Sequence, residues 1–504
     1  MSTGFARWKA ITREKGPGVF SIYVEDRRKE MKYMEIWDGF MKIVLGFSGF
    51  IWGDFMLYFL GLGALFITIR SGAIQFRHFG YAWSQTIGKA FSRKKASVTS
   101  DTSEGTLSPF EALSTALANT IGSGNIVGVA LAIYWGGPGA VFWMWLLAFL
   151  GMGTKFAEVI MGQKYRERLE DGTFVGGPQY FLSVGLKKFG LGWLGPFYAI
   201  MLVLTLAITE MIQCNSLTAS VHEAFGIPVT VSGIFFTVLV AIILFGGITR
   251  VGVVAGKVVP FMAAIYIGAG LVIVVMNASQ VPAILSMIVT GAFTPVAAVG
   301  GFGGATVATA MRWGLARGAF SNEAGDGAAA IAHATAVTDH PVRQGLYGIM
   351  EVFIDTVLVC TVTALVVLIT GAWTGTNAGD APERLTTIAF GIIWGGFGKS
   401  LVAVCLTLFA FTSMLAYGYY GETQGTYFGG KPLGIVVRCL FIASIFIGIF
   451  WNAKQLWPFC DVFFAGMIFP TVVGLILMNR EYAELVREFF TTPEKYYMKD
   501  KRKS

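Results

Sequence analysis

Apolar runs long enough to cross a lipid bilayer recur along most of the chain. A membrane-spanning helix needs about 20 consecutive apolar residues, and such runs follow one another from about residue 48 to residue 478. Of the 504 residues, 55% are hydrophobic and only 13% are charged, which is about half the charged fraction of a soluble protein. The pattern predicts an all-α polytopic membrane protein, because a helix satisfies its own backbone hydrogen bonds within lipid.

We expect about eleven transmembrane helices. Their approximate ranges are 48–69, 108–133, 138–162, 195–221, 229–247, 253–276, 284–310, 346–370, 386–419, 433–450 and 456–478. The predicted domains are a polar N-terminal arm at 1–45, a transmembrane domain at 46–480 and a basic cytoplasmic tail at 481–504.

The net charge of +8 is explained by orientation in a membrane, and no nucleic-acid partner is expected. One set of loops holds Arg70, Arg77, Lys89, Arg93, Lys94, Lys95, Lys164, Arg166, Arg168, Lys187, Lys188, Arg250, Lys257, Arg312, Arg317, Arg343 and Lys431. Apart from the N-terminal arm, the opposite set holds only Arg384 and Lys454. The first set is therefore assigned to the cytoplasm of a bacterial inner membrane, together with the C-terminus. An odd number of spans places the N-terminal arm on the opposite side, although this arm is itself basic.

The residues that usually hold cofactors are few and scattered. The five cysteines show no ligand-like spacing, and the four histidines fall at helix ends or in loops. No haem, zinc or phosphate motif is present, and no nucleophile and base come together. We expect neither a cofactor nor an enzymatic activity.

Glycine makes up 64 of the 504 residues, where roughly 7% is usual. In the second span, Gly122 and Gly124 lie two residues apart beside Ser123. Such a segment propagates a helix poorly and would need new hydrogen-bond partners in lipid. The alternative is a small-residue packing face, because Gly124 and Gly128 form a GxxxG pair.

A second interruption, Gly300–Gly304, is expected five spans later in a helix that runs the opposite way. Paired interruptions in two inverted halves are typical of secondary transporters. This predicts a five-plus-five inverted repeat, about 108–277 and 284–478, preceded by one extra helix. A half-helix that starts at such a break can hold a carboxylate, and the carbonyl groups that end the preceding one can hold a small cation.

Two adjacent hydroxyl groups, Thr412 and Ser413, lie within the ninth apolar run. Sodium prefers oxygen ligands, and hydroxyl groups with carbonyl groups provide them without a buried charge. The alternative is that each hydroxyl hydrogen-bonds the carbonyl group four residues earlier in its own helix.

Several motifs together resemble the alanine or glycine:cation symporter family. They are Asn119-Thr120-Ile121-Gly122-Ser123-Gly124-Asn125-Ile126-Val127-Gly128, Trp135-Gly136-Gly137-Pro138-Gly139, Gly176-Gly177-Pro178, Arg312-Trp313-Gly314 and Arg317-Gly318-Ala319-Phe320-Ser321-Asn322-Glu323-Ala324-Gly325. The resemblance runs from near Phe50 to the last span. It implies a leucine-transporter-like fold and import of a small neutral amino acid, alanine or glycine, with sodium as the coupling ion.

The resemblance also implies roles for individual residues. The sodium ligands would be the carbonyl groups of Ala118, Ile121 and Phe409 and the hydroxyl groups of Thr412 and Ser413. The substrate contacts would be Asn119, the amides of Ser123 and Gly124, Gln213 and Phe302.

Two residues depart from the family pattern, Glu210 where Asn is usual and Asp326 where Met is usual. Within the membrane an acidic side chain is costly and is a functional candidate by default. Glu210 could bind a substrate amine, favour a cationic substrate or carry a proton; otherwise it would pair with Lys155 or a backbone group. Asp326 is expected in a cytoplasmic segment, on the surface or at a gate.

The segment that begins at Ser321 can be interpreted as a capping box that opens a cytoplasmic helix. Alternatively, Arg317 and Glu323 could form a switching ion pair at an inner gate.

The sequence therefore favours a sodium-coupled symporter that works by alternating access. The alternatives are a proton-coupled amino-acid transporter that uses Glu210, and a ligand-gated channel or sensor with the same pocket.

Overall fold

The computed structural model describes residues 39–90, 104–297, 304–374, 382–451 and 453–492. The chain divides into two compact units, Met1–Ile51 and Trp52–Ser504, and the elements below belong to the second. Within the described ranges its regular structure is helical apart from one antiparallel pair, β1 (Glu167–Arg168) and β2 (Phe174–Val175), in which Glu167 pairs with Val175.

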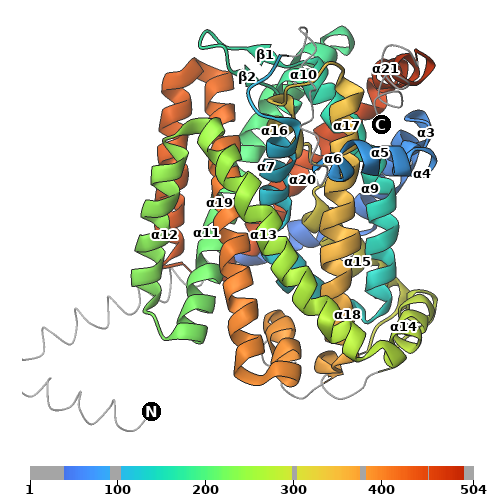
Figure 1. Ribbon diagram of the computed structural model, residues 1–504. Coiled ribbons are helices and arrows are strands. Elements are labelled where there is room, and N and C mark those ends of the chain that lie inside the picture. The colour runs from blue at the N-terminus through green and yellow to red at the C-terminus, as the bar shows by residue number, and fades with distance from the viewer. Residues whose placement is uncertain (1–38, 91–103, 298–303, 375–381, 452, 493–504) are drawn as a thin grey trace, which may run out of the picture. The chain divides into compact units, whose positions relative to one another are not determined.

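The longer elements follow one another along the chain as Figure 1 shows. In order they are α3 (Asp54–Arg70), α7 (Pro109–Thr120), η1 (Gly124–Gly128), α8 (Val129–Gly136), α9 (Gly139–Lys164), α10 (Pro178–Gly185), α11 (Leu194–Phe225), α12 (Val229–Leu244), α13 (Gly247–Met276), α14 (Val281–Phe293), α15 (Val307–Asn322), α16 (Ala329–Ala334), α17 (Pro341–Val352), η4 (Phe353–Cys360), α18 (Thr361–Ile369), α19 (Leu385–Gly448), α20 (Ala453–Leu477) and α21 (Asn479–Thr491). The shorter elements are α4 (Ile74–Arg77), α5 (Phe79–Gln85), α6 (Ile87–Ala90), η2 (Lys187–Phe189), η3 (Ala278–Gln280), η5 (Ala372–Thr374) and η7 (Pro382–Arg384).

Seven helices of the described chain are long and apolar enough to cross a membrane. The α7 and α8 helices form an eighth span that is bent by 51°. The longest helix, α19, has non-helical backbone at Gly395, Gly429 and Gly430, and α12 is a shorter apolar helix. The expected number of about eleven crossings stays a prediction. The prediction of an all-α polytopic membrane protein is confirmed.

The first interrupted span begins with a strong helix start. Ser108 caps α7: its hydroxyl accepts the Glu111 backbone N–H at 3.2 Å, and the Glu111 carboxylate accepts the Ser108 N–H at 2.9 Å. Pro109 occupies the first position, where no N–H is needed. The helix nevertheless ends after twelve residues, at the break that the glycines predict.

Among the described residues, the second interruption lies at Glu323–Ala328, between α15 and α16. The predicted span at 284–310 was wrong, because α14 ends at Phe293 and α15 begins at Val307. Glu323 has a left-handed backbone (φ 52°), and Gly325 and Gly327 also have positive φ. Residues 298–303 lie outside the described ranges, and Gly304 precedes the start of α15. The polar residues of α15 explain the error, because they lower its hydropathy below that of an ordinary span.

The α15 helix lies alongside α9 and points in the same direction. A Cβ on Gly314 would meet the carbonyl oxygen of Ala140, and one on Gly318, four residues later, would lie 3.4 Å from Leu147. Arg312 and Arg317 therefore belong to a helix within the bundle, which corrects their assignment to a cytoplasmic loop. Asp326 is only 2% exposed, so its placement at the cytoplasmic surface was also wrong.

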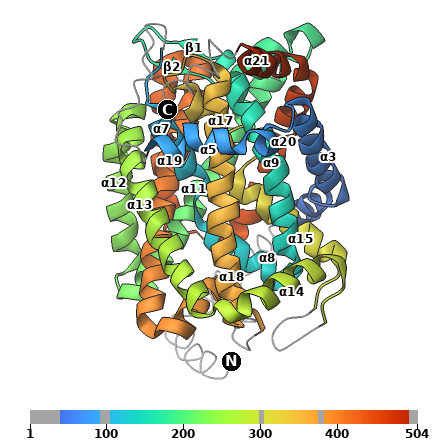
Figure 2. The same ribbon diagram turned by 45° about the vertical axis from the view of Figure 1, so that its right-hand side comes forward.

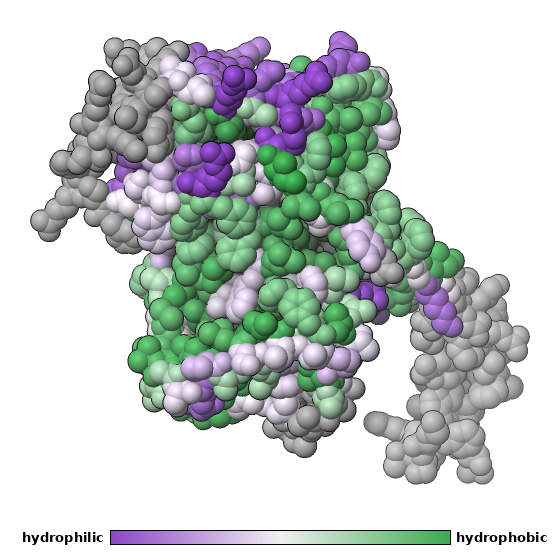
Figure 3. Space-filling view, turned by 90° about the vertical axis from the view of Figure 1, so that its right-hand side faces the viewer, coloured by the Kyte–Doolittle hydropathy of each residue, from purple (hydrophilic) through white to green (hydrophobic). Residues whose placement is uncertain are grey.

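The two repeats begin with the two interrupted helices, α7–α8 and α15–α16. In Figures 1 and 2, α7 starts at the end of this unit where β1 and β2 lie, whereas α15 starts at the opposite end, beside α14. On the face shown in Figure 3, hydrophilic residues gather at the first of these ends and hydrophobic residues cover most of the remainder. This distribution is typical of a protein with one broad apolar belt in lipid.

Candidate functional site

The first break separates α7 from η1 by three residues, Ile121–Ser123. Ile121 leaves the helical region (φ −79°, ψ 89°), and the side chain of Asn125 accepts the freed N–H of Gly122 at 2.9 Å. Ile121 and Ser123 are almost completely buried. The break therefore places helix ends inside the protein, where their partial charges are weakly screened.

Gly122 is the point at which three helices meet. A Cβ at this position would lie 2.9 Å from Nε2 of Gln213 on α11 and 2.9 Å from Oγ of Ser413 on α19. Only glycine leaves room for both side chains. The structure thus brings a predicted substrate contact and a predicted sodium ligand to the same glycine.

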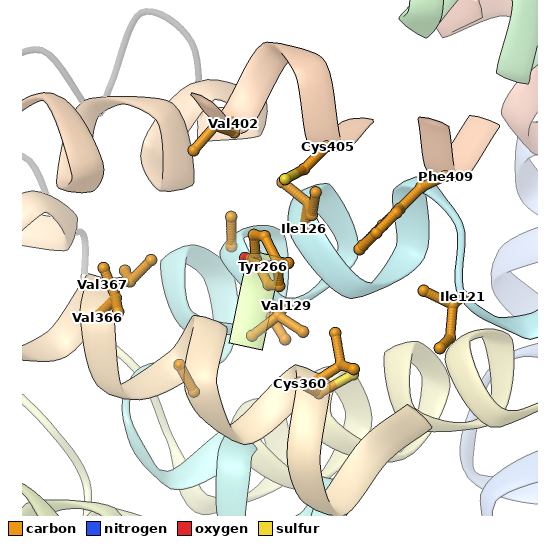
Figure 4. Packing of buried hydrophobic residues seen from close by; sticks show 14 of the residues in the cluster. Ile121, Ile126, Val129, Tyr266, Cys360, Val366, Val367, Val402, Cys405 and Phe409 are labelled. Carbon is orange, nitrogen blue, oxygen red and sulfur yellow. The ribbon is translucent and has the colours of Figure 1, made fainter. Parts of the chain in front are cut away.

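The other predicted sodium ligands lie on the same side of the break. Ala118, Ile121 and Phe409 are all buried and belong to one apolar cluster with Tyr266 and Cys360, which Figure 4 shows from close by. The ring of Phe409 meets that of Tyr266 edge-on, with centroids 5.5 Å apart.

The hydroxyl groups of Thr412 and Ser413 each donate to the carbonyl group of Phe409 at 3.0 Å. Thr412 also donates to Leu408 at 3.1 Å. Hydrogen bonds of this kind, to carbonyl groups of the same helix, are the alternative to a sodium site that the sequence left open. A hydroxyl oxygen that donates its proton in this way still has lone pairs for a cation, so the two arrangements are compatible.

Among the predicted substrate contacts, Ser123 and Gly124 lie at the first break, whereas Phe302 lies outside the described residues. Ser123 and Gly124 begin the second half-helix and are buried. A Cβ on Gly124 would lie 3.4 Å from the ring of Phe320 on α15. Phe302 falls in 298–303, outside the described ranges. Phe320 is a further aromatic residue at the site, and its sequence neighbourhood gives no sign of this contact.

Direct hydrogen bonds join the two breaks. The Asn119 amide donates to the carboxylate of Glu323. The Asn125 amide donates to Oγ of Ser321 at 3.1 Å and to Oδ1 of Asp355 at 2.5 Å. The sequence does not indicate these contacts, because Ser321 and Asp355 are far from Asn125 along the chain.

Lys155 on α9 anchors the second break. Its ammonium group donates to the carbonyl oxygen of Glu323 at 2.8 Å and lies 3.5 Å from Glu351 and 3.9 Å from Glu158. All of these side chains are buried. Lys155 therefore pairs with both Glu158 and Glu351.

Glu210 on α11 is completely buried, and neither of its carboxylate oxygens has a hydrogen-bond partner in the described part of the chain. The suggested pairing with Lys155 was therefore wrong. Glu210 lies one turn before Gln213 on the same helix, so both side chains lie on a similar face of α11.

Arg317 and Glu323 form no ion pair in the structure. The Arg317 guanidinium lies over the rings of Trp313 and Trp457, 5.3 Å and 5.7 Å from their centroids. Glu323 ends α15 and follows Ser321 and Asn322 at the end of that helix, so the capping-box interpretation was wrong. An ion pair between Arg317 and Glu323 in another conformation stays a prediction.

Several buried polar atoms around the two breaks have no hydrogen-bond partner among the described residues. They include Oδ1 of Asn119, Oε1 of Gln213, Nδ2 of Asn322 and both oxygens of Glu210. Buried polar groups are normally paired, and a concentration of unpaired ones is typical of a site for a polar ligand.

Two interrupted helices that meet within a bundle of inverted repeats define a secondary transporter. The solved structure of a manganese transporter from Eremococcus coleocola, in complex with an aromatic bis-isothiourea compound, has a similar fold. Its TM-score is 0.51 at 11% identity, and the match covers 78% of this chain and 88% of that one. The expected leucine-transporter-like fold is confirmed.

The chain belongs to the sodium:alanine symporter family, whose model matches residues 37–503. It is 43% identical over 457 residues to an uncharacterized transporter, YflA, of Bacillus subtilis, covering 91% of this chain and 95% of that one. It is 40% identical over 443 residues to the sodium/alanine symporter AgcS of Methanococcus maripaludis, covering 87% and 95%. The family consists of sodium-coupled amino-acid symporters, which are multi-pass membrane proteins and not enzymes.

Proposed function

We propose that this protein imports a small neutral amino acid, alanine or glycine, together with sodium, by alternating access. The observation that carries the proposal is the meeting of Gln213 and Ser413 at Gly122. There the end of one half-helix, a hydroxyl group and an amide group face one another in a buried site.

In this proposal sodium binds to the carbonyl groups of Ala118, Ile121 and Phe409 and to the hydroxyl groups of Thr412 and Ser413. The carbonyl groups at the end of α7 carry the negative end of a helix dipole, which favours a cation. Sodium bound there would stabilise the break and prepare the adjacent half-helix.

The amino acid would bind next to the sodium ion, with its carboxylate at the amides of Ser123 and Gly124. These amides begin the second half-helix, where the dipole is positive. Asn119 and Gln213 each have an unpaired amide oxygen that can accept a hydrogen bond from the substrate ammonium group. The close packing of Phe320 against Gly124 favours a small side chain.

Counterflow of labelled alanine into proteoliposomes, with and without sodium, tests the proposal. We expect accumulation against a concentration gradient when sodium is present. One charge that moves down 100 mV supplies about 2.3 kcal/mol. Uptake that only equilibrates alanine would indicate a ligand-gated channel or sensor, and uptake that ignores sodium would contradict sodium coupling.

A second candidate function is proton-coupled transport through Glu210. The observation in its favour is that this carboxyl group is completely buried and has no hydrogen-bond partner among the described residues. Accumulation that follows a pH gradient in the absence of sodium, and that Glu210→Gln abolishes, would support this candidate.

We also propose that the protein resides in a bacterial inner membrane with its C-terminus in the cytoplasm and its N-terminus on the opposite side. The basic loops at one end of the helical unit support this orientation. Labelling of single cysteines introduced near Arg384 and near Lys431 from outside intact cells would test it.

A further inference from the structure

A second group of charged side chains surrounds the break between α15 and α16. Glu158 comes from α9, Glu323 and Asp326 come from the break itself, and Glu351 comes from α17. Their exposed fractions are 0%, 8%, 2% and 0%. We call these four residues the acidic cluster.

The positive charges around the acidic cluster do not balance it. Among the described residues, the ammonium group of Lys155 lies within 4 Å of Glu158 and Glu351. The ring of His333 lies between two partners, with Nε2 3.1 Å from Glu351 and Nδ1 2.8 Å from the Gln344 amide. Even a protonated His333 would leave two carboxylates without a counter-charge, which is costly inside a membrane protein.

Two further helices each carry a buried hydroxyl group that interacts electrostatically with the acidic cluster. The hydroxyl groups of Tyr198 on α11 and Tyr420 on α19 are completely buried and have no hydrogen-bond partner among the described residues. Tyr198 interacts electrostatically with Asp326 and Glu158, and Tyr420 interacts with Glu351.

Oε2 of Glu158 and Oε1 of Glu351 form ion pairs with Lys155 and have no hydrogen bond in the described part of the chain. Asp355 on η4 is a further buried acidic group, and its carboxylate accepts a hydrogen bond at 2.8 Å from Ser321, two residues before Glu323. The acidic cluster therefore contains an excess of negative charge, and Tyr198 and Tyr420 add the unpaired polar atoms.

The arrangement suits a proton better than a metal ion. Among the described residues no three acidic, histidine or cysteine side chains converge as metal ligands would. Instead the carboxyl groups have separate partners: Glu158 accepts the Gly325 N–H at 2.6 Å, Asp326 accepts the Ala328 N–H at 2.9 Å, and Glu351 lies 3.5 Å from Lys155. A proton needs only one such carboxyl group, whereas a metal ion would need several side chains that converge on one point.

We propose that the acidic cluster holds a proton when the amino acid is absent and releases it when the amino acid binds. This inference rests on the proposed function. The amide of Asn119 at the first break is bonded to Glu323 of the cluster, so an ammonium group held there lies beside the cluster. The positive charge of the ammonium group replaces that of the proton. One carboxyl O–H bond in the cluster breaks, water accepts the proton, and the carboxyl group remains as a carboxylate.

Isothermal titration of alanine into the purified protein with sodium tests the inference. The titration is repeated in two buffers with different ionisation enthalpies, so that the difference in heat counts the protons released. We expect about one proton released per alanine bound at pH 7. Equal heats in both buffers would overturn the inference while leaving the proposed function intact. Absence of any alanine binding would overturn both.

Variants locate the source of the proton. Glu158→Gln and Asp326→Asn should reduce proton release at least twofold, and Glu481→Gln, in α21 outside the cluster, should leave it unchanged. Full release from both cluster variants would overturn the assignment. If these variants fail to fold, the pH dependence of the wild-type affinity for alanine tests the inference instead. Proton release on binding requires this affinity to increase as the pH is raised. An affinity independent of pH would then refute the inference.

Discussion

Substitution of Gly122 by alanine tests the site where it is most crowded. The new Cβ would lie 2.9 Å from Nε2 of Gln213 and 2.9 Å from Oγ of Ser413, whereas ordinary contacts begin at 3.4 Å. At least one of these side chains must therefore move by about 0.5 Å. Overpacking of this kind costs about 1–3 kcal/mol, which corresponds to a loss of affinity of roughly 5-fold to 150-fold.

The assay is uptake of labelled alanine into proteoliposomes at a series of sodium concentrations. We expect Gly122→Ala to raise the sodium concentration that gives half-maximal uptake, because Ser413 is a proposed sodium ligand. It should also raise the alanine concentration required, because Gln213 is a proposed substrate contact.

Gly128→Ala is the matched control. Gly128 lies in η1, two turns beyond Gly122, and a Cβ there would meet only Cδ of Arg317, at 4.0 Å. This variant should transport with an unchanged sodium dependence. The reasoning is refuted if Gly122→Ala folds and keeps the wild-type dependence on both sodium and alanine, or if Gly128→Ala is equally impaired.

Three further predictions concern other parts of the molecule. Thr412→Ala should reduce sodium affinity strongly without reducing the amount of folded protein, and an unchanged sodium dependence of uptake would contradict the proposed sodium ligands. Lys155→Met should destabilise the protein by about 3–5 kcal/mol, because it leaves buried carboxylates without their partner; thermal unfolding in detergent measures this, and a wild-type midpoint would contradict it. Although partial burial acts in the opposite direction, hydrogen bonds from Lys164, Lys188 and Tyr165 lower the pKa of Glu481 to about 2. The stabilisation of α21 that depends on this carboxylate is present above its unfolded pKa of about 4.3 and is lost as the pH falls towards 2. Amide hydrogen exchange of residues 479–491, corrected for the intrinsic rate, should show this loss, and Glu481→Gln should not.

The sequence by itself determined the class of the protein and the first half of the site. Long apolar runs require helices in lipid, so an all-α membrane protein could be predicted without a structure. Gly122 and Gly124 identified the first break because their effect on a helix is local. The motifs around them identified the family, and with it the residues proposed to bind sodium.

The tertiary structure decided where the second break lies and what surrounds it. The α15 helix contains Arg312 and Arg317, so its hydropathy is that of a loop, although close packing against α9 makes it a span. Glu323 has a left-handed backbone that a glycine pattern does not reveal. The acidic cluster comes from three separate segments of the chain, and only folding brings these carboxyl groups to one lysine. Contacts between distant segments depend on how helices pack, and no local pattern in the sequence records them.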